Sequence, residues 1–130
     1  MSQIPPDLKY TQDHEWLKAD GLTITLGITD YAQAQLGDVV MVELPKVGTA
    51  LRAGQVFGSV ESPKSVSDLM TPIAGTVVAV NQALDDAPEA INTSPYDSGW
   101  VCQIAVTDLE AFSALLDAAG YTAFLSGLDH

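Results

Sequence analysis

The stretch Gly58-Ser-Val-Glu-Ser-Pro-Lys-Ser-Val-Ser-Asp-Leu-Met-Thr-Pro-Ile-Ala-Gly75 decides the fold of this chain. Its flanks, residues 55–61 and 65–70, are rich in β-branched and apolar residues bounded by Gly and Pro, which is typical of paired strands. Between them, Ser62-Pro-Lys-Ser65 suits a type I turn, with Ser at the first position and Pro at the second. We therefore expect Lys64 to project from the tip of a β-hairpin.

Lys64 has an ordinary interpretation and a functional one. Lysines at hairpin tips commonly do no more than keep an exposed sheet edge soluble. This chain, however, has five basic residues against seventeen acidic ones, and Lys64 lies between Glu61 and Asp68. A lone cation in an acidic hairpin is a candidate for a specific role.

Length and charge restrict the class of protein. The chain has 130 residues, the size of one domain, and its net charge of −12 disfavours binding to nucleic acid. No run approaches the ~20 apolar residues that a membrane span needs. Residues 1–7 are expected to form a loose arm, without the basic and apolar regions of a secretory signal. We expect a monomeric cytoplasmic protein of bacterial type, with a mature mitochondrial form as the alternative.

Other strands are predicted by alternating apolar residues. They are expected at 14–18, 22–26, 39–44, 76–80 and 100–106. The first two are joined by a turn at Ala19-Asp-Gly21, since Asp-Gly is a strong hairpin signal. Asp30 is expected to cap a short helix over 31–36 that Gly37 ends.

The C-terminal segment, residues 107–130, is predicted to be helical. Thr107-Asp-Leu-Glu110 has the pattern of a capping box, and the helix that follows is expected to end at Gly120. A second short helical stretch is expected over 121–125. With a further helical turn at 88–91, the chain is predicted to be a single mainly β domain with short C-terminal helices.

The common catalytic constellations are missing from the sequence. The chain has two histidines, and His14-Glu15 lacks the second His of a zinc-protease motif, so no metal site is expected. Cys102 alternates with apolar residues of one strand and is expected to be a buried core thiol. The chain has no Gly-rich phosphate loop. We therefore expect a non-catalytic protein.

The lysine segment resembles that of a known family. Val60-Glu-Ser-Pro-Lys-Ser-Val-Ser-Asp68, followed by 72–77, is similar to the lipoyl-lysine segment of the glycine cleavage system H protein. The similarity covers roughly residues 8–125 and is carried further by blocks at 8–10, 14–16, 26–30, 36–45, 88–92, 94–96 and 99–100. Two positions depart from the family pattern: Pro63 replaces an aliphatic residue, and Asp13 a small hydroxyl residue.

The resemblance implies a fold, a cofactor and partners. It implies a barrel-sandwich hybrid of the lipoyl and biotinyl carrier type, with lipoic acid in amide linkage to Lys64. The arm would shuttle the aminomethyl group of glycine between three enzymes: a pyridoxal-phosphate glycine decarboxylase, a tetrahydrofolate-dependent aminomethyltransferase and a dihydrolipoamide dehydrogenase that uses FAD. A lipoate-attaching enzyme would be a fourth partner. The resemblance also implies that Glu15 and Asp68 lie near the cleft where the loaded arm rests.

Three alternatives remain at this point. A lipoyl domain of a 2-oxoacid dehydrogenase would lack the blocks at 14–16 and 88–100. A related carrier that relays lipoate to other enzymes has nearly the same sequence pattern. An unmodified β-module that only binds proteins would carry no lipoyl group at all.

Overall fold

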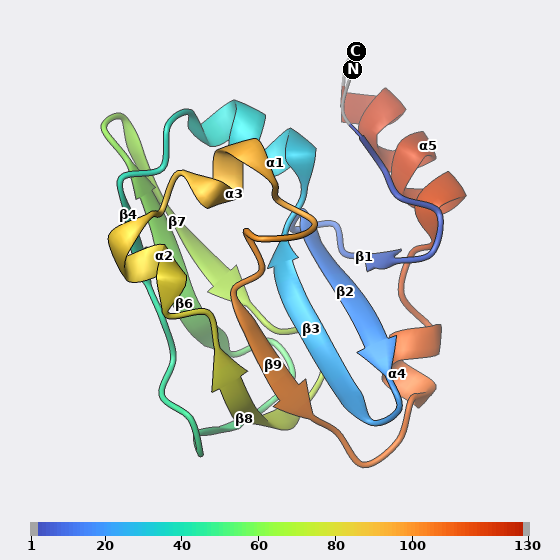
Figure 1. Ribbon diagram of the computed structural model, residues 1–130. Helices are drawn as coiled ribbons and strands as arrows, with labels where there is room; N and C mark the ends of the chain where they lie inside the picture. The colour runs from blue at the N-terminus through green and yellow to red at the C-terminus, as the bar shows by residue number, and fades with distance from the viewer. Residues whose placement is uncertain (1–2, 129–130) are drawn as a thin grey trace.

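The chain forms two β-sheets that face each other, with short helices around them, as the computed structural model describes for residues 3–128 (Figure 1). The larger sheet has the order β1-β2-β3-β9-β8-β5, with β1 Lys9–Tyr10, β2 Glu15–Asp20, β3 Thr23–Ile28, β9 Cys102–Ala105, β8 Gly75–Val80 and β5 Ala50–Leu51. The smaller sheet has the order β4-β6-β7, with β4 Met41–Glu43, β6 Val56–Ser62 and β7 Ser65–Met70. All strand pairs are antiparallel.

The helices are short and lie at the ends of the sheets and beside the larger one (Figure 1). They are α1 Asp30–Leu36, α2 Ala83–Asp86, α3 Ala90–Thr93, α4 Glu110–Ser113 and α5 Ala118–Leu128. Within the described residues, none of them is long and apolar enough to cross a membrane. The expected fold class, mainly β with C-terminal helices, is confirmed.

Both predicted hairpins are present. In the β6–β7 hairpin, Ser62 pairs with Ser65, which leaves Pro63 and Lys64 as a two-residue loop. A type I turn requires a negative φ at both central residues, and neither Pro63 nor Lys64 has a positive φ. In the β2–β3 hairpin, Gly21 adopts a φ of 61°, a conformation that glycine takes at little cost.

The main core contains residues from both sheets. Leu26 of β3, Val60 of β6 and Leu69 of β7 are all almost fully buried in one cluster. Each such side chain contributes roughly 1.5–3 kcal/mol through burial, so the lysine hairpin is firmly anchored at its base. Cys102 belongs to the same cluster, as the sequence predicts, and burial raises the pKa of its thiol to about 12.

A second, aromatic cluster joins α5 to the larger sheet. The rings of Tyr10 in β1 and Tyr121 in α5 are stacked, with their centroids 4.7 Å apart. Trp16 of β2 is buried beside them, and its indole N–H donates to the Pro95 carbonyl at 2.8 Å. This cluster fixes the C-terminal helix against the N-terminal strands.

The helix boundaries correct several predictions. Thr29, not Asp30, caps α1, because the Thr29 hydroxyl accepts a hydrogen bond from the Ala32 amide at 3.2 Å. The capping box at Thr107 does not form, since the Glu110 amide donates instead to the Asp108 carboxylate at 3.0 Å. Gly120 lies inside α5 and does not end a helix.

The N-terminal arm is held to the domain. The Gln3 amide donates to the Asp30 carboxylate at 2.9 Å, and the Gln3 carbonyl accepts a hydrogen bond from the Tyr96 hydroxyl. The Tyr10 hydroxyl likewise donates to the Pro5 carbonyl. Residues 3–7, expected from the sequence to be loose, are thus tied down by three hydrogen bonds.

Candidate functional site

Lys64 stands at the exposed tip of the smaller sheet. Pro63 and Lys64 are both exposed, whereas Ser62, which closes the loop, is buried. Lys64 also passes close to the loop after α1: its Cε lies 3.6 Å from the place that a Cβ on Gly37 would take. The tip therefore presents an exposed primary amine on a rigid base, with its side chain running past the loop after α1.

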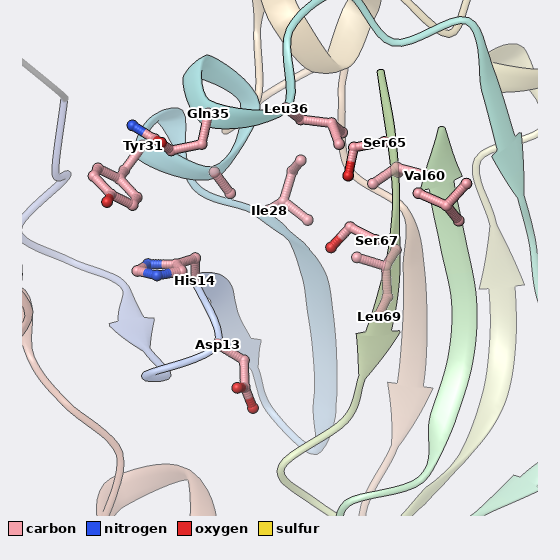
Figure 2. Close-up of a pocket in the computed structure, with 12 residues that line it drawn as sticks. Asp13, His14, Ile28, Tyr31, Gln35, Leu36, Val60, Ser65, Ser67 and Leu69 are labelled. Carbon is pink, nitrogen blue, oxygen red and sulfur yellow. The ribbon is translucent and has the colours of Figure 1, made fainter. Parts of the chain in front are cut away.

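A cleft of about 360 Å³ opens beside the hairpin, between β7, α1 and the loop before β2 (Figure 2). The side chains of Ser65, Ser67 and Leu69 point toward it from β7 in Figure 2. The whole lining consists of Asp13, His14, Ile28, Tyr31, Ala32, Gln35, Leu36, Val60, Ser65, Val66, Ser67 and Leu69. The cleft therefore has an apolar floor and a polar rim.

His14 is held at the rim by an unusual backbone conformation. It has a φ of 67°, a value rarely adopted by residues other than glycine. Its Nδ1 lies 2.9 Å from the Tyr121 hydroxyl, and its ring packs against Tyr31 at 4.7 Å between centroids. Burial lowers the pKa of His14 and outweighs the opposing effect of Asp13. The lowered pKa favours the neutral imidazole at the cleft.

Glu15 is buried behind this rim. It is 2% exposed, and its carboxylate accepts hydrogen bonds from the Met70 amide at 2.9 Å and the Thr11 hydroxyl at 3.1 Å. Burial is the main cause that raises the pKa of Glu15 to about 7. Its side chain thus joins β2 to the end of β7 and is not part of the cleft lining.

Asp68 lies on the other side of the hairpin. It is exposed, is paired with Ser59, and lines a second hollow with Glu43, Leu44, Val56, Phe57, Gly58 and Ser59. Side chains alternate along a strand, so Asp68 points away from the face that carries Ser67 and Leu69. The structure therefore does not bring Glu15 and Asp68 together.

The polar residues that do line the cleft are Asp13 and His14, with Gln35 and the two serines of β7. From the sequence, Asp13 is a departure from the family pattern at one possible cleft contact, and His14 has no expected role. Tyr31 and Gln35 were missed, because nothing in a seven-residue helix indicates which of its faces borders a cleft. Among residues 3–128, no group of three or more His, Cys, Asp or Glu is placed to hold a metal ion.

An exposed lysine on a β-hairpin of a small two-sheet domain, beside a cleft, fits a carrier-type module. Comparison with known proteins gives the family. The family model described as glycine cleavage H-protein matches residues 8–127. The chain therefore belongs to the glycine cleavage H-protein family and is a carrier component of the glycine cleavage system.

Relatives of known name support this membership. The glycine cleavage system H protein of Anaeromyxobacter sp. strain K is 54% identical over 123 residues, which cover 95% of this chain and 96% of that protein. The H protein of Opitutus terrae is 56% identical over 123 residues, covering 93% and 96%. The crystal structure of a glycine cleavage system H protein from Mycobacterium marinum superposes with a TM-score of 0.85 at 42% identity, covering 95% of this chain and 99% of that one. The expected family and fold are confirmed.

Proposed function

We propose that Lys64 carries lipoic acid in amide linkage and that the chain moves this arm between the enzymes of glycine cleavage. The observation that carries the proposal is the exposed position of Lys64 on a two-residue loop, at the tip of a hairpin whose base is buried. Such a tip offers the amine to active sites of different shape. The rigid sheet below it fixes the point from which the arm extends.

The residues around Lys64 fit such a group. A lipoyl arm needs an exposed primary amine and, when it rests, apolar surface that shelters its alkyl chain. Lys64 supplies the amine, and Ile28, Leu36 and Leu69 supply apolar surface in the adjacent cleft. Amide formation replaces the ammonium by a neutral group, so entry into an apolar pocket requires no desolvation of a cation.

The chain's own residues hold and shelter the arm. The Ser62 hydroxyl donates to the Ser65 carbonyl at 3.4 Å, and the ring of Pro63 restricts the backbone just before the lysine. The Asp13 carboxylate at the rim of the cleft would favour a cationic group beside it. When bound, the dithiolane supplies the thiol–disulfide and group-carrying chemistry that the polypeptide lacks.

The proposed partners are those that the cycle requires. They are a glycine decarboxylase with pyridoxal phosphate, an aminomethyltransferase with tetrahydrofolate, a dihydrolipoamide dehydrogenase with FAD, and the enzyme that attaches the lipoyl group. In this scheme the chain itself catalyses no step. The cytoplasmic location expected from the sequence stays a prediction.

Glu15 and Asp68 stay proposed contacts of the loaded arm. Both oxygens of Glu15 already accept hydrogen bonds, and Asp68 is open to the outer face of the hairpin. Decay of the aminomethylated protein, followed by mass spectrometry with the partner enzymes removed, measures the shelter of the loaded arm. Faster decay of Glu15→Gln or Asp68→Asn than of wild type supports contact, while Asp13→Asn tests the cleft rim. Wild-type decay rates in the first two variants would refute their role.

Mass spectrometry tests the attachment site. The protein treated with lipoate, ATP and a lipoate ligase should gain one lipoyl group, and peptide mapping should place it on Lys64. Lys64→Arg should fold normally and gain none, because a guanidinium is a poor nucleophile. A lipoyl group on Lys9, Lys18 or Lys46 would overturn the proposal. Glycine-dependent exchange of carbon dioxide with the decarboxylase then separates glycine cleavage from lipoyl relay.

A further inference from the structure

The outer edge of β7 is an open edge of the smaller sheet. β7 is the last strand in the order β4-β6-β7, and it begins directly after Lys64. Four of its six residues, from Ser65 to Asp68, are exposed. Open edges offer unpaired backbone groups to other chains, and proteins commonly protect them with Pro, Lys or a covering loop. β7 contains neither Pro nor Lys.

The register shows which backbone groups face outward. In an antiparallel pair, residues that exchange hydrogen bonds with the partner strand alternate with residues whose N–H and C=O point away. Ser62 and Ser65 close a two-residue loop, so Ser65 and Ser67 bond to β6. Val66 and Asp68 must then direct their amides and carbonyls outward. The next residue in this alternation, Met70, confirms the direction, because its amide donates to Glu15 at 2.9 Å and not to β6.

The outward groups of Met70 are therefore used within the domain, but those of Val66 and Asp68 are not. Outside the β6–β7 pair, no hydrogen bond between residues 3–128 involves the backbone of either residue. Their two amides and two carbonyls have the spacing, every second residue, at which an added β-strand could pair with them. The domain thus leaves outward backbone groups at two positions of β7, residues 66 and 68, next to the lysine that is to be modified.

The charge of this edge indicates the kind of strand that fits it. Asp68 lies on β7 itself, Glu43 lines the hollow on the outer face, and Asp13 borders the cleft on the inner face. The hairpin from 56 to 70 has one basic residue, Lys64, whose charge disappears when it is acylated. An added strand with Lys or Arg side chains would complement both faces, and the net charge of −12 would guide it there.

We propose that the open edge of β7, at Val66 and Asp68, docks a basic extended segment of the lipoate-attaching enzyme as an added strand. The inference rests on the proposed function of Lys64. That enzyme must hold a flexible, exposed side chain in one place. The added strand would fix the backbone of β7 at Val66, two residues or roughly 7 Å along the chain from Lys64, at 3.2–3.4 Å per residue. Main-chain pairing depends little on the identity of the side chains. The enzyme would therefore recognise the hairpin by the position of its backbone relative to the lysine.

Proline at position 66 removes an outward amide and leaves the β6–β7 ladder intact. Proline is tolerated in an edge strand where its nitrogen faces outward. Val66→Pro should raise the KM of the ligase for the unmodified protein about tenfold, which corresponds to about 1.4 kcal/mol and lies within the range for the loss of one hydrogen bond. Val66→Thr keeps the amide and the β-branched shape, and its KM should stay within about twofold of wild type. Thermal melting of both variants checks their folding.

Hydrogen exchange of the wild-type protein tests the same edge without a substitution. When the ligase binds, the amides of Val66 and Asp68 should exchange more slowly, while that of Ser67, already paired with β6, should change little. Unchanged exchange at Val66 and Asp68 in the complex, or equal KM values for Val66→Pro and wild type, would overturn the inference. Absence of a lipoyl group on wild-type Lys64 would instead overturn the proposed function, so the two failures are distinguishable.

Discussion

The Glu15 carboxylate accepts a hydrogen bond of 2.9 Å from the Met70 backbone amide, and so joins the start of β2 to the end of β7. This contact holds the two sheets together just behind the cleft. It also occupies the outward amide of Met70, so the open edge of β7 is confined to the part nearest Lys64. A buried acid thus separates the anchored half of the hairpin from its accessible half.

Glu15 should make stability depend on pH. Burial raises its pKa from 4.5 to about 7 in the folded chain. A raised acid pKa means that folding favours the protonated form. The contribution of Glu15 to the free energy of unfolding is therefore complete below pH 4.5 and is lost as pH rises through about 7. We expect the free energy of unfolding of Glu15→Gln, relative to wild type, to increase by roughly 2–3 kcal/mol between pH 4 and pH 8.

Urea unfolding at a series of pH values measures this difference. At pH 4 the glutamine and the protonated acid are both neutral, so the two proteins should differ little there, which serves as the internal control. Glutamine also keeps an oxygen that can accept from Met70. A difference that stays constant from pH 4 to pH 8 would show that Glu15 is ionised as easily in the folded chain as in the unfolded one.

The position of the lysine on the loop should decide whether it is modified. The double variant Lys64→Ser with Ser65→Lys keeps the composition, the charge and the loop length. It moves the lysine to a residue whose side chain points toward the cleft. We expect the melting temperature to change by only a few degrees and lipoylation to fall at least tenfold, as measured by intact mass. Lipoylation at the wild-type rate would mean that any lysine near the tip is accepted.

Much of the hairpin and little of the cleft could be predicted from the sequence. The hairpin around Pro63 and Lys64 is formed by residues that are neighbours in the chain, so its two strands and its turn follow from local preferences. The burial of Glu15 depends on Met70, which lies 55 positions away. No local pattern distinguishes such a contact from a surface acid.

The C-terminal segment shows how local signals compete. Thr107 and Glu110 fit a capping box, in which the Thr107 hydroxyl would accept from the Glu110 amide. That amide donates instead to the Asp108 carboxylate, and α4 is only one turn long. Gly120 was expected to end a helix because glycine does so commonly. Packing of Tyr121 against Tyr10 instead stabilises α5 through this glycine. Tertiary contacts thus outweigh the propensity of a single residue.

Gly27 should be indispensable for the packing of Trp16. A Cβ built on Gly27 would lie 2.6 Å from the Trp16 indole, which is 2% exposed and fixed by its hydrogen bond to Pro95. We expect Gly27→Ala to lower the free energy of unfolding by about 1–3 kcal/mol. The matched control is Gly127→Ala in α5, where the added Cβ meets no atom within 4 Å and should stabilise the helix slightly. Equal stability of the two variants would contradict the close packing of Trp16.

The Tyr121 hydroxyl should stabilise the rim of the cleft. It lies 2.9 Å from His14 Nδ1 and 2.7 Å from the Thr29 hydroxyl, which in turn caps α1. Tyr121→Phe keeps the ring that stacks on Tyr10 but leaves both polar partners without this hydrogen bond. We expect the free energy of unfolding to fall by roughly 1–3 kcal/mol.

Tyr31→Phe is the matched control for this change. The Tyr31 ring also packs against His14, at 4.7 Å between centroids, but its hydroxyl makes no hydrogen bond within residues 3–128. Its removal should therefore leave stability within about 0.5 kcal/mol of wild type. Chemical denaturation gives the free energies, and hydrogen exchange of the Ala32 amide reports whether the cap of α1 loosens in Tyr121→Phe alone. If both phenylalanine variants are equally stable, α5 is held by ring packing, and the hydroxyl contacts at the cleft contribute nothing measurable.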